Sequence, residues 1–142
     1  MSQLLIFLPL LAQVTLTLAI LVALGFARVR DLTARKVHPD KVALAGPEAW
    51  SEGPQKLAAC YRNQLELPVL FYVAGLFAFS ARLVDAVLLG AAFVFVASRF
   101  VHAAIHIGPN RVRPRFYAFL VGVAALAVMW ARLAMSVVST GF

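Results

Sequence analysis

The sequence predicts an all-α integral membrane protein, folded as a bundle of four membrane-spanning helices. Of its 142 residues, 63% are hydrophobic and only 13% are charged, whereas soluble domains average about 45–50% apolar and about 25% charged residues. The length fits one domain, residues 1–142, with four spans of about 20 residues and short connections. Open sheets leave backbone groups unpaired in lipid, so spans of this kind are expected to be helices.

Four apolar runs define the expected spans, at about residues 4–27, 57–81, 86–107 and 116–138. The connection 28–56 is polar and is interrupted by prolines and glycines, with room for one short surface helix. Pro54 suits the first turn of the helix that follows, because an N–H at that position would have no partner. Gly108, Pro109 and Asn110 end the third span and begin the connection 108–115.

The basic residues predict an orientation in the membrane. Nine lysine and arginine residues lie in the connections 28–56 and 108–115, and one lies in the remaining connection. The positive-inside rule therefore places those two loops in the cytoplasm and both termini on the non-cytoplasmic side. A charge of +7 spread between apolar runs is not the basic face of a nucleic-acid binder. With a single cysteine, Cys60, no disulfide or multi-cysteine metal site is expected.

Two of the expected spans can cross the bilayer only by carrying polar side chains into it. The second span carries a stripe of Arg62, Asn63 and Glu66, and the third carries Arg99, His102 and His106. An ionisable group at such depth costs at least about 2.5–3.5 kcal/mol, so both stripes should face protein. Counted from the cytoplasmic helix ends, Glu66 and Arg99 lie at one depth, about 12–14 Å. Arg62 and His102 share another depth, about 8 Å.

Arg28 and Arg115, at the cytoplasmic mouths of the first and fourth spans, open onto the same layer. The expected pocket then holds four arginines and one carboxylate. A guanidinium group matches a carboxylate with two hydrogen bonds at a time, and Glu66 is free to receive an ammonium group. The implied ligand is a small zwitterion with more than one carboxylate, which suits a peptide.

With these residues the chain resembles a known family, the membrane-associated proteins in eicosanoid and glutathione metabolism (MAPEG), which includes microsomal glutathione transferases and prostaglandin E synthase. The matching segments are YRNQLELPVLF at 61–71 and RFVHAAIHIGPNRVRPRF at 99–116. The helix number, the length and the long first loop are similar too. The resemblance implies a homotrimer with glutathione bound between neighbouring subunits, and we expect a bacterial member located in the inner membrane.

The resemblance also assigns roles to individual residues. Arg62, Asn63 and Glu66 match the family's glutathione-holding R-N-x-x-E motif. His102 matches the histidine that follows the third-helix arginine, here Arg99, by three residues, and Arg28 takes the place of a first-helix arginine that contacts glutathione. The expected glutathione-binding residues are Arg28, Arg62, Asn63, Glu66, His102 and His106.

Arg115 is the expected catalytic residue. Its separation from His102 along the sequence matches that of the family arginine assigned to hold the glutathione sulfur as thiolate. A neighbouring guanidinium lowers the pKa of a thiol and so increases the fraction of the nucleophilic thiolate.

Three departures from the family pattern bear on the activity. His106 and Phe119 stand where characterised members have tyrosines, and Phe116 stands where prostaglandin E synthase has a serine. The resemblance implies a glutathione-dependent transferase or peroxidase acting on apolar electrophiles or lipid hydroperoxides. Two alternatives stay open: a non-catalytic relative that binds glutathione or lipid, and a small multidrug exporter with Glu66 as proton relay. Surrounding arginines would hold Glu66 ionised, which disfavours the exporter.

Several of these polar residues also have a purely structural interpretation. Arg99 and Glu66 could form an ion pair that joins two helices, and His106 could be a packing residue. Arg132, near the far end of the fourth span, should extend to the non-cytoplasmic interface. Pro68 removes one backbone hydrogen bond, which predicts a kink beside Glu66.

Overall fold

The computed structural model describes residues 2–36, 38–43 and 45–139, so residues 1, 37, 44 and 140–142 of the predicted domain lie outside the described residues. Helices account for all of its regular secondary structure, and no strand occurs in these three ranges. The elements are η1 (Gln3–Ile6), α1 (Phe7–Arg35), α2 (Pro39–Ala43), η2 (Pro47–Ala49), α3 (Glu52–Gln64), α4 (Leu67–Ser80), α5 (Ala86–Ile107) and α6 (Val112–Ser139). The all-α prediction is therefore confirmed.

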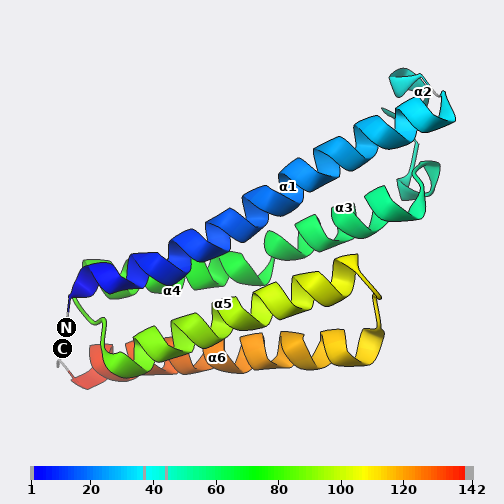
Figure 1. The fold of residues 1–142 in the computed structure, drawn as a ribbon. Coiled ribbons are helices and arrows are strands. Elements are labelled where there is room, and N and C mark those ends of the chain that lie inside the picture. The colour runs from blue at the N-terminus through cyan, green and yellow to red at the C-terminus, as the bar shows by residue number, and fades with distance from the viewer. Residues whose placement is uncertain (1, 37, 44, 140–142) are drawn as a thin grey trace.

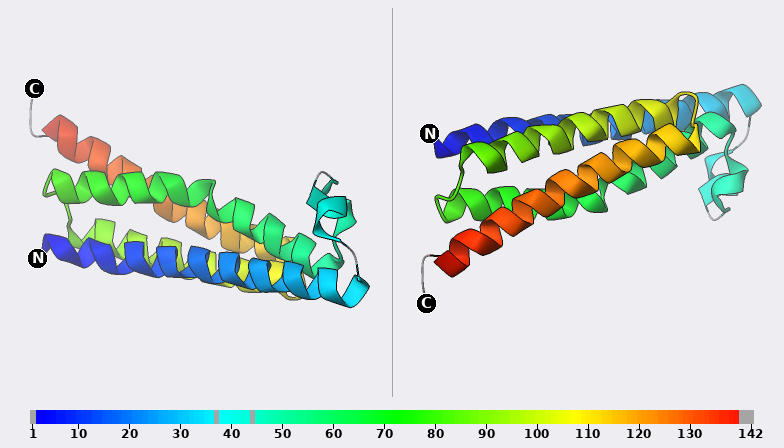
Figure 2. Two further views of the ribbon diagram at one scale, coloured as in Figure 1. Left: turned by 90° about the horizontal axis from the view of Figure 1, so that it is seen from above. Right: turned by 90° about the horizontal axis from the view of Figure 1, so that it is seen from below.

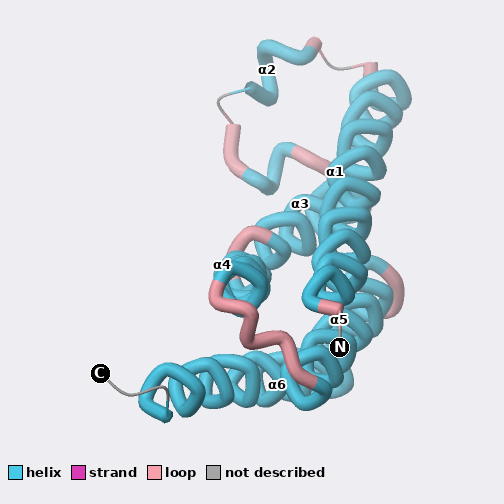
Figure 3. The backbone as a smooth tube through the Cα atoms, turned by 90° about the vertical axis from the view of Figure 1, so that its left-hand side faces the viewer, coloured by secondary structure: helices cyan, strands magenta, loops and turns pink. Residues whose placement is uncertain are grey.

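The long helices lie lengthwise beside one another (Figure 1). α3 and α4 follow each other end to end alongside α1, while α5 and α6 form an antiparallel pair. The start of α1, the α4–α5 connection and the end of α6 share one end of the molecule, and α2 and the α5–α6 turn share the other (Figure 1). Figure 2 shows α6 running obliquely past α4, which it contacts. Loops are confined to the connections between helices (Figure 3).

Within the described ranges, three helices are long and apolar enough to cross a membrane, namely α1 with η1, α5 and α6. α3 and α4 have 13 and 14 residues, and a single span needs about 20. The expected continuous helix over 57–81 is therefore wrong in this respect, because the chain leaves the helical conformation at Leu65 and Glu66. Pro68 is the physical reason, since it has no N–H to donate to the carbonyl of Gln64.

At the end of the molecule that contains α2 and the α5–α6 turn (Figure 1), two helices extend past the predicted spans. α1 continues to Arg35 rather than ending at 27, and α6 begins at Val112 rather than 116. A span boundary marks the edge of the hydrocarbon, whereas a helix satisfies its own backbone and can continue into the aqueous layer. α5 has the expected bounds, and Pro54 lies in the first turn of α3 as predicted.

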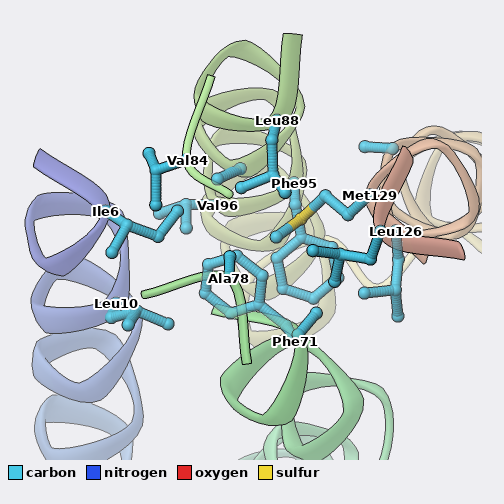
Figure 4. Packing of buried hydrophobic residues seen from close by; sticks show 14 residues of the cluster. Ile6, Leu10, Phe71, Ala78, Val84, Leu88, Phe95, Val96, Leu126 and Met129 are labelled. Carbon is cyan, nitrogen blue, oxygen red and sulfur yellow. The ribbon is translucent and has the colours of Figure 1, made fainter. Parts of the chain in front are cut away.

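The main hydrophobic core lies toward the end of the molecule where α1 begins and α6 ends (Figure 1). Figure 4 shows the rings of Phe71 and Phe95 facing each other, and their centroids are 4.4 Å apart. Ile6 of η1 and Leu10 of α1 approach this stack from one side and α6 residues from the other (Figure 4). Gly75 allows the close approach of α1 and α4, because a Cβ there would lie 2.8 Å from a methyl carbon of Leu10.

Polar contacts close the same end of the molecule. Asp85 caps α5 by accepting a hydrogen bond from the Leu88 N–H at 2.8 Å, and it also pairs with Arg132 at 2.6 Å. Arg132 thus ties α6 to the α4–α5 connection. The side chain of Gln3 exchanges two hydrogen bonds with the backbone of Val84, which ties the start of the chain to this connection.

Candidate functional site

The polar stripe of α3 does not present a single face. Asn63 is half-buried and points toward α5, whereas Arg62 and Glu66 are exposed on the isolated chain. Glu66 lies in the break between α3 and α4 with non-helical backbone angles, so the helical spacing used to place it beside Arg62 ends before it. Asn63 therefore faces the interior of the molecule, whereas Glu66, the expected carboxylate of the site, is exposed in the break.

Arg99 of α5 is fully buried and is held by Asn63. Its Nη2 donates to the backbone carbonyl of Asn63 at 3.3 Å and also to the side-chain oxygen of the same residue. Its Nε and Nη1 are buried and have no hydrogen-bond partner. Glu66 is close enough to Arg99 to interact with it electrostatically, yet the hydrogen-bond partner of Arg99 is Asn63. These two nitrogens of a buried cation carry three N–H groups, which are thus left for another acceptor.

The two histidines of α5 lie together beside the start of α6. His102 Nδ1 lies 3.1 Å from the carbonyl oxygen of Arg115, and because a carbonyl only accepts, this nitrogen carries the hydrogen. His102 Nε2 and His106 Nδ1 are buried without a partner. The His106 ring lies edge-on to the His102 ring, with 5.7 Å between their centroids. The ring of Phe119, on α6, has its centroid 6.1 Å from that of His102.

Arg115 is fixed by the turn that joins α5 to α6. Its Nη1 donates to the side-chain oxygen of Asn110, and its carbonyl accepts from His102. Asn110 was predicted as part of a helix-breaking sequence and not as a site residue. The one available signal was its type, since asparagine tolerates the left-handed backbone that it adopts here, with φ of 50°.

A second polar region surrounds a cavity of about 510 Å³ between α1, the loop before α3 and α3 itself. Arg28 and Arg62 line it, together with apolar side chains that include Leu24 and Tyr61. The guanidinium of Arg28 lies 5.2 Å from the centre of the Trp50 ring, which is within cation–π range. The cavity thus combines two cations with an apolar wall.

The loop that carries Trp50 is fastened to the end of α1. Asp31 accepts a hydrogen bond from the Ser51 N–H at 3.1 Å, and Arg35 pairs with Asp31 at 3.2 Å while donating to the Ala49 carbonyl at 2.6 Å. Hydrogen bonds from Ser51, with a smaller contribution from Arg35, hold the pKa of Asp31 below its usual value. The aromatic wall of the cavity is thereby attached to the helix that supplies Arg28.

A model of the MAPEG family matches residues 6–135 of this 142-residue chain. The chain belongs to the MAPEG family. Comparison with curated proteins and with solved structures gave no match. Together with its apolar helices, membership makes this MAPEG chain an integral membrane protein with a function related to glutathione or eicosanoid metabolism.

The structure distributes the expected MAPEG site residues over two regions of one chain. An inner region between α3, α5 and the start of α6 contains Asn63, Arg99, His102, His106 and Arg115. An outer region contains Arg28 and Arg62, while Glu66 is exposed at the break. Among the residues described, no group of three or more histidine, cysteine or acidic side chains could hold a metal ion.

Sequence reasoning missed one further buried contact in the MAPEG chain. Gln13 of α1 donates to the side-chain oxygen of Gln64 at 3.0 Å, and both side chains are almost completely buried. Gln64 is the last residue of α3, whose carbonyl Pro68 leaves free. A glutamine within an apolar run was the available signal, because an amide in lipid requires a partner.

Proposed function

We propose that this MAPEG protein is a membrane-embedded, glutathione-dependent transferase or peroxidase. Its second substrates would be apolar electrophiles or lipid hydroperoxides that arrive from the bilayer. The observation that carries the proposal is the pair of unpartnered guanidinium nitrogens, Nε and Nη1, on the fully buried Arg99. A buried donor without an acceptor costs about 1–3 kcal/mol, and more when it is charged, so such groups indicate a site for an anionic ligand.

The residues present fit the three charged groups of glutathione. Arg99 offers two free donors to one carboxylate, and Arg28 and Arg62 line a common cavity that suits the other. Glu66, exposed in the break that follows α3, can receive the ammonium group. Because guanidinium groups bind carboxylates with two parallel hydrogen bonds, this set favours a dicarboxylate zwitterion over a simple fatty acid.

In this proposal Arg115 stabilises the thiolate of bound glutathione, since a nearby cation lowers the pKa of a thiol. In conjugation the sulfur forms a bond to an electrophilic carbon, and the leaving group departs with the bonding electrons. In the peroxidase reaction two glutathione molecules are oxidised to the disulfide while a hydroperoxide is reduced to an alcohol and water. His102, with Nε2 unpartnered, can accept a hydrogen bond from the peptide.

The exposed charges at the end of α3 and in the break after it support assembly with further copies of the chain. Arg62 and Glu66 lie at predicted membrane depth and are exposed on the isolated chain. Left against lipid, each would cost at least about 2.5–3.5 kcal/mol. We therefore propose the homotrimer implied by the resemblance, in which a neighbouring subunit covers these residues and glutathione lies between subunits. The proposed orientation keeps the basic loops in the cytoplasm of a bacterium and both termini outside its inner membrane.

The test is glutathione binding and turnover by the detergent-purified protein. Arg62→Ala should weaken glutathione binding by about 2 kcal/mol, roughly 30-fold, because one charge-assisted carboxylate contact is lost. Glu66→Gln should weaken it through loss of the ammonium contact. Neither change should alter the oligomeric state.

Matched controls are Arg113→Ala and Glu52→Gln, which remove the same charges from exposed positions outside the proposed site. Turnover is measured with chlorodinitrobenzene and with a lipid hydroperoxide. Loss of assembly in both site variants, with glutathione affinity no weaker than that of the controls, would contradict the proposal and favour a structural role for the charges.

One observation supports the non-catalytic alternative. His106 and Phe119 surround His102 at positions where the family pattern has tyrosine hydroxyl groups. A protein that glutathione stabilises against heat but that turns over neither substrate would be a glutathione-binding relative without chemistry.

A further inference from the structure

The turn between α5 and α6 places an amide against the guanidinium of Arg115. The Nη1 of Arg115 donates to the side-chain oxygen of Asn110, five residues earlier in the chain. The side chain of Arg115 is only partly buried, so burial alone does not fix the direction of its guanidinium. The contact with Asn110 is what the structure provides for that purpose.

The position of Asn110 is itself determined by the turn. Its backbone φ is 50°, in the left-handed region that asparagine tolerates better than most residues. Its N–H donates to the carbonyl of Ile105 at 2.7 Å, which closes the end of α5. Arg115 is fixed at its other end as well, since its carbonyl accepts a hydrogen bond from His102 at 3.1 Å.

The acceptor is neutral, and this matters for the electrostatics of the site. No carboxylate among the described residues lies within 4.0 Å of Arg115. The titratable groups of the packed helices that interact with it electrostatically are His102 and His106 on α5 and Cys60 on α3. Asn63 holds Arg99 in the same manner. An amide orients a guanidinium without cancelling its charge, whereas a carboxylate at the same place would cancel most of it.

We propose that Asn110 is a positioning residue of this site: it orients the Arg115 guanidinium and leaves its positive charge available to an anionic sulfur of the bound ligand. The inference rests on the proposed function, because the sulfur it serves is the thiolate of glutathione. Asn110 does not touch the reacting atoms, and its contribution is made through Arg115.

The test compares Asn110→Asp with Asn110→Ala in the full-length protein. The measurement is the apparent pKa of the bound glutathione thiol, from thiolate absorbance against pH. Aspartate can accept the same hydrogen bond and tolerates the same backbone, so a purely structural role predicts wild-type behaviour. The electrostatic role predicts that Asn110→Asp raises the thiol pKa by about 1 unit or more. Asn110→Ala should give a smaller rise, since Arg115 keeps its charge but loses its orientation.

Thr33→Asp is the matched control, because it adds the same charge at an exposed position at the end of α1, outside the α5–α6 turn. It should leave the thiol pKa close to the wild-type value. A wild-type pKa in Asn110→Asp, or an equal rise in Thr33→Asp, would overturn the inference. If one of the two site variants fails to fold, judged by its helical circular dichroism, the other still decides the question.

The two proposals fail in different ways. If wild-type protein binds glutathione but produces no thiolate signal, thiol activation by this chain is wrong, and the role of Asn110 is overturned with it. If the wild-type signal is present and Asn110→Asp retains it unchanged, the role of Asn110 alone is overturned.

Discussion

Arg99→Met tests whether the buried guanidinium serves the fold or a ligand. In the wild-type chain two nitrogens of Arg99, Nε and Nη1, are buried without a partner, while Nη2 makes two hydrogen bonds to Asn63. Methionine has a flexible apolar side chain that can fill irregular space in a core. The variant therefore removes both the favourable contacts and the uncompensated donors.

The two contributions have similar size. Burying two unpartnered donors costs about 2–6 kcal/mol in total, and the two hydrogen bonds to Asn63 return about 3–6 kcal/mol. The substitution should therefore change the stability of the glutathione-free protein by no more than about 2 kcal/mol, as found when buried charges are replaced by apolar groups of similar volume. In contrast, glutathione at 100 times its Kd should stabilise wild-type protein by about 2.7 kcal/mol and the variant hardly at all.

The assay is thermal unfolding in detergent, followed by helical circular dichroism with and without glutathione. Arg132→Met is the matched control, because the structure pairs Arg132 with Asp85 at the opposite end of the molecule. That variant should lose some stability and keep the full glutathione shift. The reasoning is refuted if Arg99→Met unfolds several kcal/mol more easily without ligand and still responds to glutathione, since Arg99 would then be a structural residue.

Two further predictions concern other parts of the molecule. Asp85→Ala should cost about 1.5–2 kcal/mol, because it removes a helix cap worth about 1 kcal/mol and a half-exposed ion pair with Arg132 worth about 0.5–1 kcal/mol. Asp85→Asn keeps the cap and should cost only the pair, so equal unfolding temperatures for the two variants would contradict this account. In Trp130→Phe, Trp50 is the one remaining tryptophan, and its emission should change saturably as glutathione engages the arginine beneath its ring. Unchanged emission at saturating glutathione would exclude that arginine from the site.

The helix boundaries were predictable where a local signal coincided with the end of an apolar run. Asp85 and the sequence Gly108-Pro109-Asn110 mark the two ends of α5, which has the predicted bounds. Pro68 predicted a kink, but hydropathy could not show that the helix stops at Gln64, since the apolar run continues through the break. The position of a break depends on which carbonyl is left unpaired and on how its neighbours pack.

The candidate site was predictable as a set of residues and not as a geometry. Depth along the helices placed Arg99 level with Glu66, but Glu66 is exposed in the break, and Asn63 is the hydrogen-bond partner of Arg99 instead. The contacts of Asn110 with Arg115 and of Gln13 with Gln64 were not predicted. The sequence argument located interacting residues by their formal charges, and amide side chains have none. Their partners can be identified only when the helices are placed relative to one another.

The proposed function depends on the binding of glutathione by this chain and on the activation of its thiol by Arg115. The most direct measurement is the ultraviolet difference spectrum of the purified wild-type protein and of Arg115→Ala on titration with glutathione near neutral pH. We predict a thiolate absorbance that saturates with glutathione in the wild type and is strongly reduced in the variant, although the variant still binds the peptide. A saturable thiolate signal of equal size in both proteins, or binding without any thiolate in the wild type, would contradict it.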